Sequence, residues 1–359
     1  MRWFMATVVA FFCRRWRGWK RDCRTSTHGG ARWSHGMMLF VCFAIAVPTV
    51  AAGQGMVRQG FVIEPWLSSA GDIRGVTIGP GGAFGNDPYV YSRTQQAVLR
   101  ATGEETTQVF AAGFGTGTGR LVFDPTGDFG GDMFVAGVID MAGPDDPIYR
   151  VSSNGDWSVF YQSTNSDLDL LTKGISFGKG AGFGNDLYIM DAEHQCLQRL
   201  TSNAEPTPFG SGMTSGSWED DMVITTEGDF GNYAYVADGI QHQLLRMSAS
   251  GVTTVFASIT GAKSLAIGQG SFGEYLYVGS RYGDVYQVDA QGNTSLFAWG
   301  FGDHTPEGNF GGIDIVGDTM WLTSDTGTLY RVTPVPEPSA LILLGISAIG
   351  LLAYMWRQR

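Results

Sequence analysis

The chain has 359 residues, of which 52 are glycine and only 16% are charged, and its formal net charge is −11. An apolar fraction of 43% is enough for a sizeable core, which excludes disorder as the main state. Because glycine weakens helix interiors and tolerates positive φ, this composition favours short strands and tight turns over a large helical domain. The acidic balance argues against nucleic acid as a partner.

The charge is unevenly distributed along the chain. Residues 1–52 carry eight Arg or Lys and one Asp, whereas residues 53–333 carry 13 basic and 32 acidic residues. Residues 334–359 are slightly basic again, with two Arg and one Glu. We therefore divide the chain into a leader over 1–52, an acidic body over 53–333 and a C-terminal segment over 334–359.

The leader ends in an apolar stretch that begins at Met37 and is too short to span a bilayer comfortably. Small residues at Val50 and Ala52 stand where signal peptidase reads its substrate, so we predict a signal helix that is cleaved after Ala52. A buried core segment is the alternative. The cationic flank before this stretch is longer than a signal peptide needs, which indicates that translation starts at Met37 or Met38.

The C-terminal segment contains a second apolar run. Residues 339–356 carry no charge and can just cross a bilayer core. Arg357 and Arg359 follow this run and would keep the C-terminus cytoplasmic, with the body on the other side of the membrane. We therefore expect a C-terminal transmembrane helix that anchors the precursor transiently.

A proline-bracketed tetrapeptide, Val335-Pro336-Glu337-Pro338, stands immediately before this run. The tetrapeptide, the apolar run and the basic end together resemble the PEP-CTERM sorting signal of bacteria that make exopolysaccharide. The resemblance implies recognition by an exosortase-type sorting protease, removal of the helix and transfer from the inner membrane to the cell envelope, outer surface or medium. These residues would then be a processing site without a catalytic role. A plain C-terminal anchor is the alternative.

One phrase recurs six times in the body. Its phenylalanines lie 45, 54, 47 and 42 residues apart, and the sixth copy is abbreviated. They are Phe84, Phe129, Phe183, Phe230 and Phe272. A period in the forties is typical of one propeller blade.

Each repeat contains four predicted strands. A short apolar run precedes the phrase, the phrase itself alternates, a strand of the form LxRV follows, and a glycine turn leads into the fourth strand. The last copy ends at Val332 without a fourth strand, and the segment from Gly60 to Leu67 can supply one. We therefore predict an all-β fold, a six-bladed β-propeller of four-stranded blades closed by this N-terminal strand.

The repeats YVADGIQHQLLRM (235–247) and YIMDAEHQCLQRL (188–200) resemble those of NHL-type six-bladed propellers. The resemblance extends over most of residues 60–333 and implies the architecture. It does not imply an activity, because six-bladed propellers include lactonases, lyases, receptors and scaffolds.

Three aspartates, Asp87, Asp132 and Asp186, recur just before the second strand of a repeat. Aspartate caps tight turns with its side chain, so a structural role in the turn is one interpretation. The other is that carboxylates repeated around one face form calcium-binding or sugar-binding loops. No D-x-[DN]-x-[DN]-G loop is present, so we expect no obligatory cofactor, with Ca²⁺ as the alternative.

Acidic patches at 140–146, 167–169 and 219–221 are expected to be solvated loops. If one of them binds a metal ion, that ion should be Ca²⁺, because carboxylate and carbonyl oxygens suit a hard cation. The body has a single cysteine, Cys196, which excludes an internal disulfide and is most simply a core residue.

A basic residue recurs in the third strand of the repeats. Structural ion pairs or carbonyl contacts, one per blade, are the simpler interpretation, and a cationic ring for an anionic polysaccharide is the alternative. The positions are Arg100, Arg150, Arg199, Arg246 and Arg331, with Gln287 in the fifth copy.

The sequence offers little material for catalysis. The histidines of the body, His194, His242 and His304, belong to no G-x-S-x-G, HExxH, paired-cysteine or P-loop pattern. Our main hypothesis is an exported, non-enzymatic propeller that binds exopolysaccharide or envelope proteins or serves as a scaffold. The alternative is a lactonase-like or lyase-like enzyme with a metal ion in the central channel.

The start-site hypothesis makes a direct prediction. If translation starts at Met37 or Met38, peptides from residues 1–36 will be missing from the precursor. N-terminal peptide mass spectrometry of the protein made in its own cells measures this, and any peptide from residues 1–36 would contradict the hypothesis.

Overall fold

The computed structural model describes residues 55–68, 70–139, 147–162, 172–191, 195–213, 221–301, 311–324, 326–336, 351 and 353–358. Within this part of the chain, no helix is both long enough and apolar enough to cross a membrane. The two predicted helices at the chain ends therefore stay predictions. Sequence-predicted sites outside the described residues are Val50, Ala52, Glu337, Pro338, Arg359, His194 and His304, together with the acidic patches 140–146 and 167–169.

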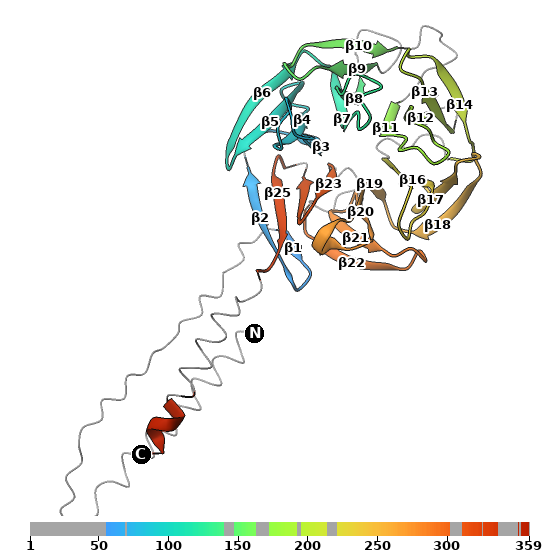
Figure 1. Ribbon diagram of the computed structural model, residues 1–359. Coiled ribbons are helices and arrows are strands. Elements are labelled where there is room, and N and C mark those ends of the chain that lie inside the picture. Colours follow the sequence, from blue (N-terminus) through green and yellow to red (C-terminus); the bar gives the residue numbers. More distant parts are fainter. Residues whose placement is uncertain are drawn as a thin grey trace, which may run out of the picture. The chain divides into compact units, whose positions relative to one another are not determined.

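The described strands form six antiparallel sheets arranged in a ring (Figure 1). The first blade contains β3 (Ile73–Ile78), β4 (Pro88–Ser92), β5 (Ala97–Gly103) and β6 (Thr106–Ala112). The second contains β7 (Thr116–Phe123), β8 (Met133–Ile139), β9 (Ile148–Val151) and β10 (Trp157–Tyr161). The third contains β11 (Thr172–Phe177), β12 (Leu187–Asp191), β13 (Cys196–Leu200) and β14 (Pro206–Phe209).

The remaining blades follow in chain order. The fourth contains β15 (Met222–Thr225), β16 (Tyr233–Asp238), β17 (Gln243–Ser248) and β18 (Thr253–Ser258). The fifth contains β19 (Ala262–Ile267), β20 (Leu276–Ser280), β21 (Asp284–Val288) and β22 (Thr294–Trp299), with the short helix η1 (Gly270–Phe272) before β20. The sixth contains β23 (Ile313–Val316), β24 (Thr319–Thr323), β25 (Leu329–Pro334) and β2 (Phe61–Leu67). The predicted six-bladed propeller is confirmed.

The first strand of each blade lies innermost, and each inner strand contacts the inner strands of both neighbouring blades. This close approach requires glycine at particular positions. A Cβ atom on Gly75 would lie 2.2 Å from the carbonyl oxygen of Gly119, and one on Gly311 would lie 2.3 Å from that of Arg74. The glycine-rich composition therefore serves strand packing around the axis as well as turns.

The repeated phrase forms one structural unit in four blades. The hydroxyl of Tyr188 donates a hydrogen bond to the carbonyl oxygen of Phe183 at 2.7 Å, and their rings pack edge to face at 5.6 Å. The same bond joins Tyr89 to Phe84, Tyr235 to Phe230 and Tyr277 to Phe272. The spacing of five residues thus buries both rings and satisfies the phenol.

The N-terminal segment closes the ring. β2 pairs antiparallel with β25, from Phe61 opposite Pro334 to Leu67 opposite Leu329. This confirms the predicted closing strand. A second contact of this segment was not predicted. β1 (Met56–Val57) pairs with β22 and adds a fifth strand to the fifth blade.

Phe61 joins these two attachments. Its ring stacks on Phe272 at 5.0 Å and meets Phe297 edge to face at 5.2 Å, and both partners belong to the fifth blade. The segment 56–67 therefore fastens the fifth blade to the sixth.

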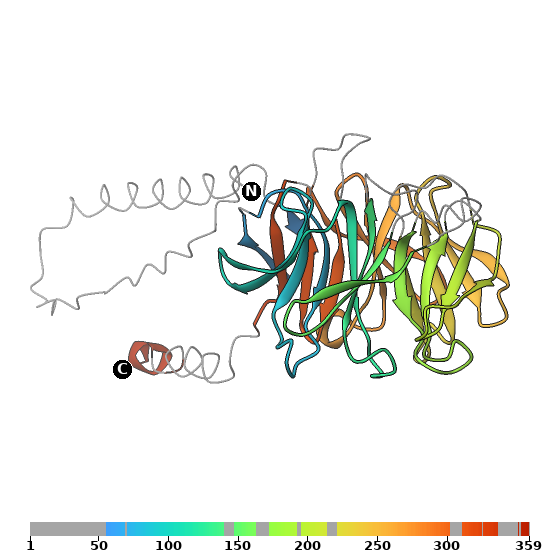
Figure 2. The same ribbon diagram turned by 90° about the horizontal axis from the view of Figure 1, so that it is seen from above.

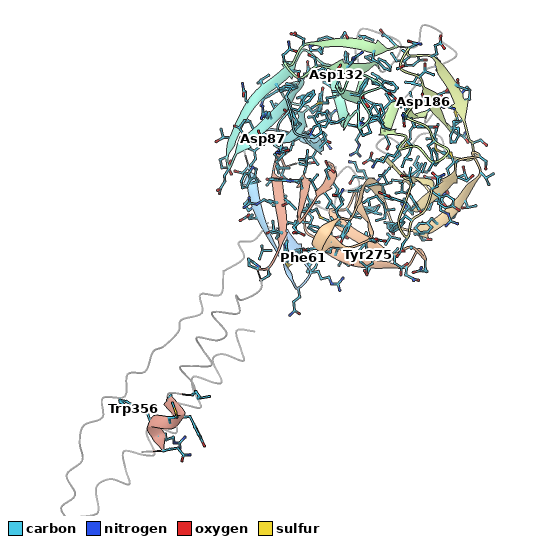
Figure 3. The ribbon with its side chains drawn as sticks, in the orientation of Figure 1. Phe61, Asp87, Asp132, Asp186, Tyr275 and Trp356 are labelled. Atoms are coloured by element: carbon cyan, nitrogen blue, oxygen red, sulfur yellow. The ribbon has the colours of Figure 1, made fainter. Side chains whose placement is uncertain are left out.

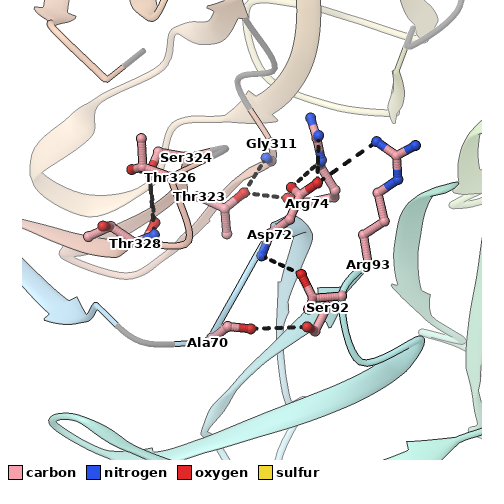
Figure 4. A network of polar contacts seen from close by, with 12 residues as sticks. Ala70, Asp72, Arg74, Ser92, Arg93, Gly311, Thr323, Ser324, Thr326 and Thr328 are labelled. Carbon is pink, nitrogen blue, oxygen red and sulfur yellow. Dashed lines mark hydrogen bonds and ion pairs between the residues drawn. The ribbon is translucent and has the colours of Figure 1, made fainter. Parts of the chain in front are cut away.

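Polar contacts join the sixth blade to the first (Figure 4). The hydroxyl of Thr323 donates to the carbonyl oxygen of Arg74 and accepts from the N–H of Gly312. The buried guanidinium of Arg74 pairs with Asp72 at 2.6 Å, and Arg93 lies 3.8 Å from the same carboxylate. The sixth blade, which contains strands from both ends of the body, is therefore attached to the fifth blade on one side and to the first blade on the other.

Deletion of residues 57–67 is expected to lower the melting temperature by at least about 10 °C, because it removes β2 and leaves β25 as an exposed edge. Thermal unfolding followed by circular dichroism measures this. Val62→Ala is the matched control, because Val62 lies on β2 with 43% of its side chain exposed. Equal melting temperatures for the deletion and the intact chain would contradict closure by β2.

Candidate functional site

The first turn of every blade, and the third turn of the first five blades, lie on one face of the propeller, because the strands within a blade are antiparallel (Figure 2). We call this the turn face. Its first turns are residues 79–87, 124–132, 178–186, 226–232, 268–275 and 317–318. The three sequence-predicted aspartates all lie in these turns, on successive blades (Figure 3).

Each of the three aspartates forms an ion pair with the arginine of its own blade. Arg100 Nη2 lies 2.7 Å from Asp87 Oδ2, and Arg150 Nε lies 2.5 Å from Asp132 Oδ2. Asp186 pairs in the same way with Arg199. The structure therefore spreads the aspartates over three blades and does not bring them together at one site.

The other positions of the arginine series are occupied differently. Arg331 pairs with Glu64 of β2 and lies 4.1 Å above the ring of Trp66. Arg246 lies 4.6 Å above the ring of Tyr233. Four of the five arginines are thus neutralised by carboxylates, so the described structure contains no ring of free cations.

The glutamine that breaks the series has a cation beside it. Arg58, between β1 and β2, donates from Nη1 to the Gln287 side-chain oxygen at 2.9 Å. Burial raises the pKa of Tyr277, and the nearby charge of Arg58 only partly opposes this shift. The N-terminal segment therefore brings an arginine to the one blade whose third strand lacks it.

Asp124 organises one turn with its whole carboxylate. Its Oδ1 accepts from the N–H groups of Thr126 and Gly127, and its Oδ2 accepts from those of Phe129 and Gly131. Burial favours the neutral acid, but these hydrogen bonds outweigh it and hold the pKa of Asp124 below its usual value.

The central channel forms a cavity with a volume of about 280 Å³. Residues of all six inner strands line it, and its polar groups lie at different depths. Lys179 and Gln269 lie in turns of the turn face, and Asp314 binds Ile78 at the end of β3 that leads into this face. Asp221 directly precedes β15, towards the opposite end of the channel, and lies beside Arg120.

Arg120 spans the channel. This side chain of the second blade is 4% exposed and donates to the carbonyl oxygens of Gly311 at 2.9 Å and Lys263 at 3.0 Å. Its Nη1 also lies 3.6 Å from the carboxylate of Asp221. One guanidinium therefore contacts the fourth, fifth and sixth blades, and it fills this end of the channel.

The two channel carboxylates bond neighbouring blades. Asp221 Oδ2 accepts from the N–H of Leu265 at 3.1 Å, which links the fourth blade to the fifth. Asp314 Oδ2 accepts from the N–H of Ile78 at 2.9 Å, which links the sixth blade to the first. In each aspartate, Oδ1 accepts from the next N–H of the chain, that of Met222 or Ile315.

Burial governs the ionisation of both aspartates. It raises the pKa of Asp221, although the charge of Arg120 and two main-chain N–H groups favour the carboxylate. It raises the pKa of Asp314 in the same way, against two N–H groups, the hydroxyl of Thr77 and the charge of Lys179. The expectation of a solvated loop is wrong for Asp221, whose side chain is 13% exposed in the channel.

The other candidate residues are separate. His242 accepts at Nδ1 from the N–H of Gly261 at 3.0 Å, and Cys196 is buried, with its pKa raised to about 11 by burial. Val335 and Pro336 lie directly after β25, and Arg357 lies in a short helical stretch. The described residues contain no group of three His, Cys, Asp or Glu side chains able to hold one metal ion.

Sequence reasoning missed Arg120 and Asp314. Each is the single charged residue of an inner strand that is otherwise uncharged. This isolated charge was the available signal, because a charge in a buried strand needs a specific partner.

Comparison with known proteins identifies the C-terminal segment. Residues 334–359 match the family model described as the PEP-CTERM protein-sorting motif, which confirms the resemblance. The motif marks an exported protein that an exosortase processes and that is sorted to the cell envelope or surface. No curated protein matches the sequence.

Solved structures share the propeller fold at low sequence identity. A gluconolactonase from Xanthomonas campestris aligns with a TM-score of 0.57 and 13% identity, over 78% of this chain and 95% of its own. The virginiamycin B lyase from Staphylococcus aureus gives 0.51 and 14%, over 77% and 99%. An auxiliary nutrient binding protein from Bacteroides thetaiotaomicron gives 0.55 and 13%, over 76% of each chain. At this identity the likeness shows the fold alone.

Asp124→Asn is expected to destabilise the protein by about 1–3 kcal/mol at pH 7, because the amide has one acceptor oxygen for four N–H donors. A lowered folded-state pKa contributes stability above about pH 4, and this contribution is lost as the pH falls through that pKa. The difference between variant and wild type should therefore shrink in acid. Urea unfolding from pH 2 to 7 measures it, with Asp128→Asn in the same turn as control. A difference independent of pH would contradict the role of the ionised carboxylate.

Proposed function

We propose that this exported propeller is a non-enzymatic binding module of the cell envelope or extracellular matrix, with a glycan as its ligand. The sorting motif at 334–359 supports delivery to the envelope. The observation that carries the non-enzymatic part is the guanidinium of Arg120, which fills one end of the channel and bonds the main chain of two other blades.

A metal-dependent lactonase or lyase was the alternative, and the described residues do not fit its metal ion. Such an ion needs several oxygen ligands that converge on one point. Asp221 and Asp314 instead accept hydrogen bonds from neighbouring blades, and a dication beside Asp221 would meet the positive charge of Arg120 at close range. We therefore propose a function that needs neither a catalytic metal ion nor another cofactor.

The charge distribution narrows the class of glycan. The body over 53–333 carries 13 basic and 32 acidic residues, and four arginines of the blade series are already paired with carboxylates. A strongly acidic protein repels a polyanion at moderate ionic strength. A neutral or amine-bearing polysaccharide therefore suits this propeller better than a uronate polymer.

The processing scheme completes the proposal. The apolar run 339–356 anchors the precursor in the inner membrane, and the exosortase recognises Pro336-Glu337-Pro338 and separates the propeller from this anchor. The bound propeller would then hold polysaccharide, or a protein that carries it, at the cell surface. The processing residues act as substrate in this scheme.

A glycan array with the full chain in detergent tests the proposal, together with calorimetry against Ca²⁺ with and without chelator. We expect saturable binding of at least one neutral or amine-bearing glycan that chelator does not change. Absence of binding to every glycan on the array would overturn the glycan assignment and would leave a protein as the ligand. Hydrolysis of a lactone that is abolished by chelator would overturn the non-enzymatic assignment.

A further inference from the structure

The sorting motif begins inside the last blade of the propeller. The matched segment starts at residue 334, and Pro334 is the last residue of β25, opposite Phe61 of β2. The N–H of Val335 donates to the carbonyl oxygen of Gly60 at 2.9 Å. No spacer therefore separates the closed ring from the tetrapeptide that the protease recognises, and Val335 is bonded to the closing strand.

β25 is an interior strand of its sheet. It lies between β2 and β24, so its main chain is paired along both edges, and the side chains of Leu329 and Val332 are fully buried. A protease needs an extended segment that can enter its cleft, and a strand paired on both edges is available only after local opening.

The pairing of β25 with β2 depends on contacts between the two ends of the chain. Arg331 of β25 pairs with Glu64 and lies over the ring of Trp66. Phe61 anchors the beginning of β2 on the fifth blade through its two aromatic neighbours. If β2 left, β25 would become an edge strand, and its residues could be drawn into a protease cleft.

We infer that the seam between β2 and β25 sets the N-terminal limit of the sorting cleavage. While β2 is seated, the protease cuts on the C-terminal side of Val335 and leaves β25 whole. The cut breaks one peptide bond, and water supplies the hydroxyl of the new carboxylate and the proton of the leaving amine. This inference rests on the proposed exosortase processing, and it makes the closed ring the form of the protein that is trimmed correctly.

The first test is the C-terminus of the mature protein isolated from cells that contain the sorting protease. C-terminal peptide mass spectrometry should find Val335 or a later residue as the last one in the wild type. Phe61→Ala should raise the yield of products ending within residues 329–334 by about tenfold or more, because it loosens β2. Val255→Ala is the matched control, since this residue is 60% exposed on β18, in the fourth blade.

A milder variant covers the case in which Phe61→Ala does not fold. Glu64→Gln removes the ion pair with Arg331 and keeps the shape of β2, so it should give the same products in smaller yield. Wild-type products that end before Val335 would overturn the inference. So would unchanged ends in a variant whose β25 amides exchange hydrogen faster than those of the wild type.

A measurement without the sorting protease separates this inference from the proposed processing. Proteinase K is added to the purified full chain, and the fragments are sequenced by mass spectrometry. The propeller fragment of the wild type should retain β25, whereas that of Phe61→Ala should lose it. Cells that leave the chain uncut would contradict exosortase processing, and this digestion would still decide whether the seam protects β25.

Discussion

The guanidinium of Arg120 is the group on which the centre of this propeller depends. It comes from the second blade, takes carbonyl oxygens of the fifth and sixth blades as acceptors and lies beside the carboxylate of the fourth. A buried cation without such partners would cost several kcal/mol. These contacts therefore hold the inner strands close to one another around the axis, and glycines such as Gly75 and Gly311 leave room for this close approach.

Hydrogen bonds from one blade to the next extend this arrangement around the axis. Asp221 and Asp314 each accept from an N–H of the following inner strand, and Thr323 reaches the main chain of the first blade. Polar side chains in the channel are thus used for assembly of the ring. The ion pairs on the turn face have a similar local role in separate blades. A ligand of this protein would therefore have to be recognised by groups other than these paired residues.

The blades and their closure could be predicted from the sequence because both depend on local patterns that recur. Phe–Tyr pairs five residues apart, such as Phe183 with Tyr188, mark four of the six blades, and the missing fourth strand of the last repeat points to residues 60–67 as its replacement. The sorting motif could also be predicted, because it too is a local pattern in the sequence. β1 could not be predicted, because two residues carry no period. The pairing of Arg58 with Gln287 joins residues 229 positions apart, and the contacts of Arg120 join blades on opposite sides of the ring. No spacing within the sequence encodes such contacts.

The seam also determines when the molecule can finish folding. Glu64 and Arg331 are separated by 267 positions, so the sixth blade needs both β2, near the start of the body, and β25, at its end. Closing so long a loop is slow, and its entropic cost must be met before the contacts it brings are formed. During export β2 emerges from the translocation machinery long before its partner β25, while the other blades can assemble from neighbouring strands. The ring can therefore be completed only after the whole body has crossed the membrane.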